Sequence, residues 1–469
     1  MAALRRLPDG VRLTRHTWTV AAFAYVAGMS AAASHLSWDT WAALVLAPVL
    51  FAVTLPVLRR SLRHDPSIVR LVAVALVAKM VGAVARYALT YGLYDRADAT
   101  AYHESGRRLA AAFWDGRWAQ VARVEVPELS GTPFINLVTG LVYIVTKPTV
   151  LGGFVVFSWL SFLGLFLFYK AIVVGFPEAD HRRYAYLLFF LPSMLYWPSS
   201  IGKEAWISLG LGLASYGAAL VLRHRPLGYP VAGLGLLATA GPRPHIAVLC
   251  TVALAAAYLL RRRAWADSTL GPVGKVVGIA LVLAACLGVV SKAASFFDLD
   301  EVNAGTVSSV LDYTDRQSGQ GGSEFEPTRV KSPVELPNAT LAVLFRPWPW
   351  EANSAQALIA SAEGALLLAL AVGSLPRLAR LPRFVVQVPY VAYATAYTTM
   401  FIVAFSSIGN FGILTRQRTQ VLPMLLVFLA LPLDRRRRDG GEPPVDQRGR
   451  APAGATGPVH PLPAPCTGP

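Results

Sequence analysis

Apolar residues come in long uninterrupted runs along this chain, and short polar turns separate them. Most runs are about 17–25 residues long, enough for a helix to cross a hydrocarbon core of about 30 Å. Strands of a membrane barrel would alternate apolar and polar side chains, and these runs do not alternate. The pattern predicts an all-α protein, a polytopic transmembrane helical bundle of about twelve spans.

Eleven runs have the length and apolarity of a span, and a twelfth, 228–240, is weaker. The eleven are 17–35, 39–57, 68–91, 150–173, 184–198, 204–222, 245–261, 273–291, 353–374, 384–407 and 419–433. A further apolar stretch, 133–147, is either a re-entrant or interfacial segment or a thirteenth span.

Composition supports a membrane protein. Of the 469 residues, 54% are hydrophobic and only 15% are charged, too few to coat a soluble domain of this length. The net charge is +16, from 43 Lys and Arg against 27 Asp and Glu. In a bilayer protein such an excess sets orientation through basic cytoplasmic loops, so no nucleic-acid partner is expected. Heavy use of Ala, Arg, Gly and Pro is typical of a high-GC bacterial genome, which indicates a bacterial cell membrane.

The basic loops fix the expected topology. They are Arg59–Arg63, His181–Arg183, Arg223–Arg225, Arg261–Arg263, Arg377–Arg383 and Arg435–Arg438. With twelve crossings all six face the cytoplasm, as do both termini. Residues 1–434 then form the membrane domain, with two large external loops at about 92–132 and 292–352. The tail, 435–469, is rich in Pro and Gly and is expected to be disordered.

Three ionisable side chains lie inside predicted spans, where each costs about 2.5–3.5 kcal/mol on insertion. Lys79 and Arg86 are seven residues apart and so share nearly one helical face, which leads toward the first external loop. Glu363 lies in a later span. These residues either line a polar cavity open to the outside, or Lys79 and Glu363 form a buried pair that locks two helices.

Candidate chemistry begins where the third span ends. Asp95 and Asp98 stand there, followed by His103, and a carboxylate in this place could act as a general base or bind a divalent cation. The alternative is a solvated acidic loop with a capping aspartate. The three cysteines have no spacing typical of a metal site or a disulfide framework.

Cationic residues mark three further turns on the same predicted side. Lys203 and Glu204 open a helix after a Pro- and Ser-rich turn, a place where anions bind well. The other two turns carry Arg243 with His245, and Arg416 with Arg418. Positive charge on the outer side opposes the orientation rule, so we expect these residues to converge with Arg86 on an anionic substrate. The alternative is that they extend to the lipid headgroups.

The first half of the chain resembles bacterial membrane glycosyltransferases of the GT-C type, which use polyprenyl-phosphate-linked sugars. The similarity lies in the acidic segment 94–102 within a large external loop, and in 131–143 and 191–204. One departure is that two spans precede the span that leads into the acidic loop. The second half is similar to polysaccharide polymerases and ligases, in 243–245 and in 410–418.

The resemblance implies glycosyl transfer from a polyprenyl-linked donor to a glycan acceptor outside the membrane, in cell-wall or surface-polysaccharide assembly. Asp95 or Asp98 would deprotonate the acceptor hydroxyl, and no cofactor is required, although a divalent cation could take part. The residues that would hold the lipid phosphate are Lys203, Arg243, Arg416 and Arg418, with Tyr102, Trp114 and Trp118 available to stack on a sugar.

Three other functions stay open at this point. A polysaccharide polymerase or ligase would use the same class of substrate. A transporter or flippase of lipid-linked sugars predicts charges along a path at mid-membrane, which Lys79 and Glu363 would fit. A scaffold for other wall enzymes predicts no turnover at all.

Overall fold

The computed structural model describes residues 37–63, 65–93, 98–260, 325–330, 332–352 and 354–433, together with 23 and 25–30. Most of these residues lie in helices, and no β-strand occurs among them. The predicted span 273–291, most of 17–35 and the tail from 434 lie outside the described residues, as does Asp95.

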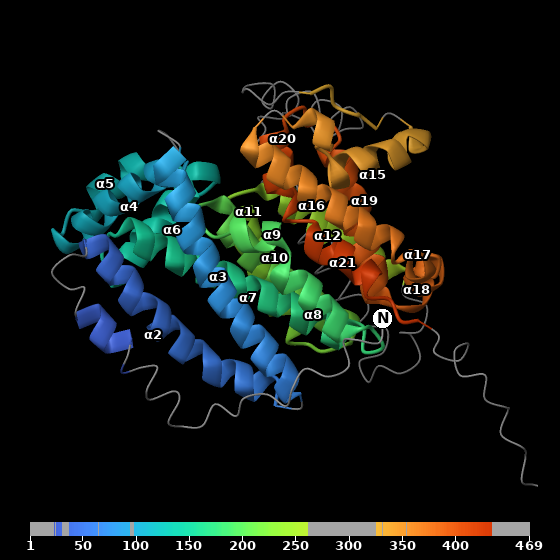
Figure 1. Ribbon diagram of the computed structural model, residues 1–469, viewed down its shortest axis with the longest axis horizontal. Coiled ribbons are helices and arrows are strands. Elements are labelled where there is room, and N and C mark those ends of the chain that lie inside the picture. The colour runs from blue at the N-terminus through green and yellow to red at the C-terminus, as the bar shows by residue number, and fades with distance from the viewer. Residues whose placement is uncertain are drawn as a thin grey trace, which may run out of the picture. The chain divides into compact units, whose positions relative to one another are not determined.

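From α2 to α12, and again from α15 to α21, the helices follow one another with short connections (Figure 1). They are α2 (Trp38–Ser61), α3 (Pro66–Leu93), α4 (Asp98–Trp114), α5 (Trp118–Glu125), α6 (Gly131–Thr146), α7 (Val150–Gly175), α8 (His181–Phe190), α9 (Pro192–Tyr196), α10 (Lys203–Leu222), α11 (Gly228–Ala240), α12 (Pro244–Leu259), α15 (Leu336–Phe345), α16 (Ala355–Val372), α17 (Leu375–Leu378), α18 (Leu381–Gln387), α19 (Pro389–Phe405), α20 (Phe411–Arg418) and α21 (Leu422–Leu429). Two 3-10 turns, Pro333–Glu335 and Pro349–Glu351, flank α15.

Four helices are long and apolar enough to cross a membrane: α2, α3, α7 and α10. A fifth span results if α18 and α19, which meet at 119°, cross together as one bent segment. Among the described residues, the other predicted spans are shorter helices. The 13 residues of α11, for example, reach only about 20 Å at 1.5 Å per residue. The 16-residue α6, which covers the ambiguous stretch 133–147, reaches about 24 Å, also less than the hydrocarbon thickness.

Apolar side chains cover the outside of α2. Val45, Val49, Val53 and Val57 are four residues apart, form one stripe and are 49–59% exposed. A valine stripe facing outward on a 24-residue helix suits lipid rather than water. Together with the long apolar helices, this stripe identifies an integral membrane protein.

Close backbone contacts hold α7 and α10 together. A methyl group added at Gly164 of α7 would overlap the carbonyl oxygen of Ser208, and one added at Gly212 would overlap the carbonyl of Gly164. Small residues allow such approach in membrane helices, where packing replaces the hydrophobic driving force. Gly153 lies against Ile201, and Gly164 lies against Ser208 further along both helices. The two helices therefore run parallel, and the start of α10 lies near the start of α7.

The segment between α7 and α10 crosses back as a broken helix. Pro192 ends α8 and starts α9, because a proline disfavours the helical conformation of the residue before it. Lys79 Nζ donates to the carbonyl of Met194 at 2.5 Å, while the Glu363 carboxylate accepts from the backbone N–H and the hydroxyl of Ser193. Lys79 and Glu363 therefore do not form the buried pair considered from the sequence; each binds α9 separately.

Arginine-rich turns gather at one end of the helices. Arg223 Nε at the end of α10 donates to the carbonyl of Val174 at 3.1 Å, and Arg377 is 3.0 Å from Asp180. Those two contacts bring the carboxyl ends of α7, α10 and α16 together. The basic residues at this end are Arg59, Arg60, Arg63, Arg70, Arg182, Arg183, Arg223, Arg225, Arg377, Arg380 and Arg383. The polar residues described next lie at the opposite end of α3 and α10.

Candidate functional site

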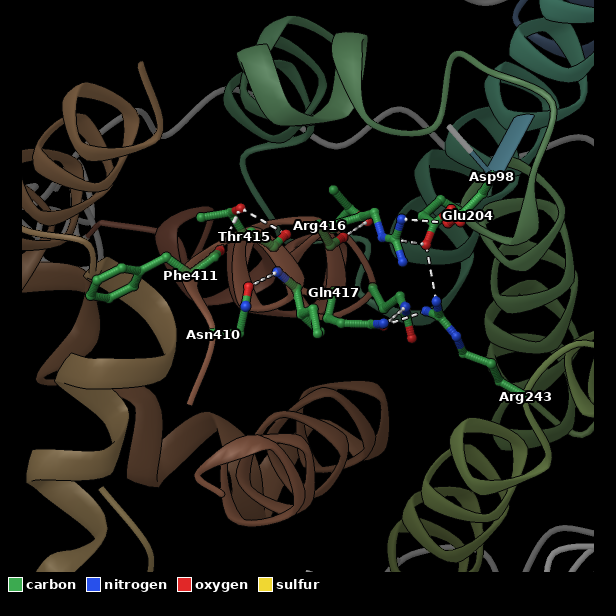
Figure 2. A network of polar contacts seen from close by, with 12 residues as sticks. Asp98, Glu204, Arg243, Asn410, Phe411, Thr415, Arg416 and Gln417 are labelled. Carbon is green, nitrogen blue, oxygen red and sulfur yellow. Dashed lines mark hydrogen bonds and ion pairs between the residues drawn. The ribbon is translucent and has the colours of Figure 1, made fainter. Parts of the chain in front are cut away.

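An ion-pair network joins four segments far apart in the sequence (Figure 2). Asp98 begins α4, and its side chain is 64% exposed. Arg416 Nη1 of α20 donates to Asp98 Oδ2 at 3.0 Å. The second predicted carboxylate, Asp95, lies just before α4 and outside the described residues.

Glu204 is the buried centre of this network. It is the second residue of α10, its side chain is 9% exposed, and Arg243 Nη2 donates to its Oε1 at 2.9 Å. The Nε of Arg416 lies 3.1 Å from the same oxygen. One buried carboxylate thus holds two arginines from different helices, and the Glu204 charge raises the pKa of Arg416.

The sequence did not point to Gln417, which completes the network. Its Oε1 accepts from Arg243 Nη1 and from Gln420 Nε2. Adjacent residues on a helix point about 100° apart, so only one of Arg416, Gln417 and Arg418 can face a given neighbour. Sequence spacing alone could not show that the neutral amide faces Arg243.

Local interactions fix the orientation of α20. The side chain of Asn410 caps the helix by accepting from the N–H of Ile413 at 3.1 Å. Phe411 stacks on Phe325, with ring centroids 4.2 Å apart. Figure 2 shows Asn410 and Phe411 at one end of α20 and Arg416 pointing away toward Glu204.

Arg418 lies apart from the other predicted cations. It is buried and donates to the backbone carbonyls of Val343 and Arg346, at the carboxyl end of α15. Those carbonyls have no partner within the helix, and a cation there also complements the helix dipole. In this structure Arg418 joins α20 to α15 and does not contact the network.

Lys203 is the cation of the cluster without a direct partner. It is half-buried at the start of α10, within electrostatic range of Arg243, Glu204 and Asp98. It forms no hydrogen bond or ion pair with any residue in the described part of the chain. Lys203, Arg243 and Arg416 provide three positive charges against the two carboxylates of Asp98 and Glu204. Among the described residues, this cluster therefore has one more positive charge than its two carboxylates balance.

Tyr102 lies one turn along α4 from Asp98, on the side facing the network. Its ring is near Gly202, and burial together with the Glu204 and Asp98 carboxylates raises its pKa to about 12. The hydroxyl therefore stays protonated at neutral pH and can donate a hydrogen bond. Of the other predicted aromatic residues, Trp114 is 59% exposed beneath Lys147 Nζ, which is 4.4 Å from its ring, and Trp118 contacts Phe113.

The three remaining predicted residues lie around the network rather than in it. The Nδ1 atom of His103 is 2.7 Å from the hydroxyl of Tyr143, and burial lowers the pKa of this histidine. The ring of His245 packs near Phe405, two residues after Arg243. Arg86 donates to the Tyr196 hydroxyl at 2.6 Å and its guanidinium covers that ring.

Among the described residues, no group of three or more His, Cys, Asp or Glu side chains is arranged to hold a metal ion. The divalent cation that the acidic loop could bind would need Asp95, which lies outside those residues.

The chain was compared with protein-family models, curated proteins and solved structures, and none of them matches it. Any function assigned to the network therefore rests on its own residues and geometry.

Proposed function

We propose that this protein is an integral membrane glycosyltransferase, which transfers a sugar from a polyprenyl phosphate to a glycan acceptor outside the cell membrane. The observation that carries the proposal is the network itself. An exposed carboxylate, Asp98, lies directly beside a cluster of three cations, and the described carboxylates balance only two of these charges. A base next to an anion-binding group is what transfer from a phosphate leaving group requires.

In the proposed reaction, the carboxylate of Asp98 takes the proton of the acceptor hydroxyl. The acceptor oxygen forms a bond to the anomeric carbon as the bond from that carbon to the phosphate oxygen breaks. The electron pair of the broken bond stays on the polyprenyl phosphate. Lys203, with Arg416 and Arg243 behind it, stabilises that charge because the cations are fixed before the reaction begins. Asp95, three residues before Asp98 in the sequence, is the alternative base.

Glu204 keeps the arginines in place. Two guanidinium groups this close would repel each other without a shared counter-charge. Glu204 binds both, so Arg243 and Arg416 are oriented before substrate binds. Lys203 has no such direct partner, and an incoming phosphate would supply one.

The position of the network at one end of the helices supports an external site. The arginine-rich turns lie at the opposite end of the helices, and the positive-inside rule assigns such turns to the cytoplasm. We propose accordingly that both termini are cytoplasmic and that Asp98 faces outward. Twelve spans give this arrangement when the shorter and broken helices are counted as crossings together with the predicted spans 17–35 and 273–291. The loops 92–132 and 292–352 then lie outside.

The test uses purified protein with polyprenyl-phosphate sugars and follows release of the lipid phosphate. We expect Asp98→Asn to lower turnover by roughly 10²–10⁴-fold, as for loss of a general base. Lys203→Gln should lower it by roughly 10²–10³-fold. If Asp98→Asn turns over at the wild-type rate, Asp98 is not the base, and if Lys203→Gln does so as well the proposal fails.

Two matched control variants remove the same kinds of charge outside the network, and so distinguish loss of the proposed reaction from a general effect of charge. Asp115→Asn removes another exposed aspartate that pairs with an arginine, Arg117, at 2.7 Å. Lys170→Gln removes a half-buried lysine at the arginine-rich end. Both should keep wild-type turnover. Movement of intact lipid-linked sugar without release of phosphate would favour a transporter, and elongation of a bound glycan would favour a polymerase or ligase.

A further inference from the structure

A groove between α2 and α3 lies at the arginine-rich end, away from the network. Its volume is 470 Å³, and its walls are mostly apolar. From α2 it is lined by Phe51, Leu55 and Arg59, which are four residues apart and so form one stripe. Val69 and Arg70 line it from α3.

The charged and the apolar residues that line this groove lie at different ends of it. Arg59 and Arg70 lie near the α2–α3 turn, and Arg63, also in the lining, belongs to the turn itself. Phe51 precedes Arg59 by eight residues and so lies about 12 Å from it along α2, away from the turn. A ligand that fills the groove would need an anionic head at the turn and an apolar chain that follows α2.

Two of these arginines, Arg59 and Arg70, are available to such a head. Arg59 and Arg70 are exposed and form no ion pair with any other described residue. The acidic residue nearest in sequence, Asp65, instead accepts from the backbone N–H groups of Ser67 and Ile68 at 3.0 and 3.2 Å, where it caps α3. Asp65 thus binds the start of α3 and forms no ion pair with Arg59 or Arg70.

The groove opens where lipid is expected. Only 17% of the apolar window of α2 is buried inside the protein, against 72% for α7. An arginine-lined turn on a lipid-facing helix is also the place where membranes present anionic headgroups, which attract basic residues near the cytoplasmic surface.

We propose that this groove is a binding site for one anionic phospholipid. The arginines Arg59, Arg63 and Arg70 bind its phosphate, and an acyl chain lies along Phe51 and Leu55. The occupant is a bilayer lipid rather than a soluble phosphate, because the apolar walls would stay uncovered by a small ion. The site does not depend on the proposed transferase activity.

The test is native mass spectrometry of the full chain in detergent, titrated with dioleoyl phosphatidylglycerol or dioleoyl phosphatidylcholine. We expect tighter binding of phosphatidylglycerol, with affinity lost by about fivefold for each arginine replaced. The triple variant R59Q/R63Q/R70Q should bind the two lipids equally. Leu55→Trp, which fills the groove without changing charge, should weaken binding of both.

Arg60→Gln is the matched control. Arg60 lies on the same turn of α2 with the same charge, but it does not line the groove. It should keep the wild-type preference. Equal effects of Arg60→Gln and Arg59→Gln, or an unchanged preference in the triple variant, would overturn the proposal. Because the measurement is lipid binding, its failure leaves the turnover test of Asp98 unaffected.

Discussion

Arg416 of α20 donates from Nη1 to the Asp98 carboxylate of α4 at 3.0 Å, and thereby joins residues 318 positions apart in the chain. The same guanidinium lies against Glu204 of α10. A single planar side chain thus connects an exposed carboxylate with a buried one. This arrangement links the start of α4 to α10, which packs closely against α7.

Loss of the buried Glu204 carboxylate should lower the free energy of unfolding more than loss of an exposed carboxylate. Glu204→Gln leaves the buried Arg243 and the half-buried Arg416 without their shared counter-charge, and we expect a loss of about 3–5 kcal/mol. Glu104→Gln removes an exposed carboxylate that pairs with Arg107 and Arg108, and should cost no more than about 1 kcal/mol. Thermal unfolding of both variants in one detergent measures the difference. Equal midpoints would mean that Glu204 does not hold the network together.

Arg416→Lys should not rescue the network, although it keeps the charge. A lysine is a point charge on a flexible stem, and it cannot touch Asp98 and Glu204 with a planar fork. Given the proposed function, we expect turnover to fall by at least tenfold while the fold persists. The measurement is lipid-phosphate release, compared with Arg123→Lys, an exposed arginine on α5. Wild-type turnover in Arg416→Lys would show that charge alone suffices.

The contact between α7 and α10 should tolerate no added methyl group. Gly164→Ala would place a carbon on the carbonyl oxygen of Ser208, and we expect overpacking to cost about 1–3 kcal/mol. Gly233→Ala in α11 meets no atom within 4 Å, so it should be neutral or stabilise by up to about 1 kcal/mol. The unfolding midpoints of the two variants provide the comparison. A midpoint for Gly164→Ala at or above that of wild type would contradict the close approach.

His103 should make stability depend on pH. Burial lowers its pKa in the folded protein below the ordinary value of 6.5, so the unfolded chain binds the proton more tightly. The contribution of His103 to the free energy of unfolding is fully present above pH 6.5. It falls as the pH drops through 6.5 toward the folded-state pKa. His103→Gln should therefore lose less stability than wild type between pH 7.5 and 5.5.

The measurement is the thermal unfolding midpoint at several pH values for both proteins. His181→Gln serves as the control, because His181 interacts with the backbone of Phe176 at the other end of the helices. This control should follow the wild-type curve. If the curves of His103→Gln and wild type run parallel, protonation of His103 does not affect folding.

The sequence by itself determined that the protein is helical and lies in a membrane, because run length and apolarity depend only on which residues are neighbours in the chain. It also singled out Asp98, Lys203, Arg243 and Arg416 as candidate site residues, because these charges stand in turns between apolar runs. The weak stretch 228–240 has the same bounds as α11, but the predicted span 184–198 is broken at Pro192 into α8 and α9.

Only the tertiary structure decided which of those charges meet. Glu204 joins two arginines from distant helices, Arg418 turns instead to the carbonyls of α15, and the neutral Gln417 takes the place beside Arg243. Likewise Lys79 and Glu363 each bind α9 and not each other. The physical reason is that helix rotation and crossing are set by packing, so residues adjacent in sequence point to different neighbours and the partner of a buried charge is fixed only once the helices have packed.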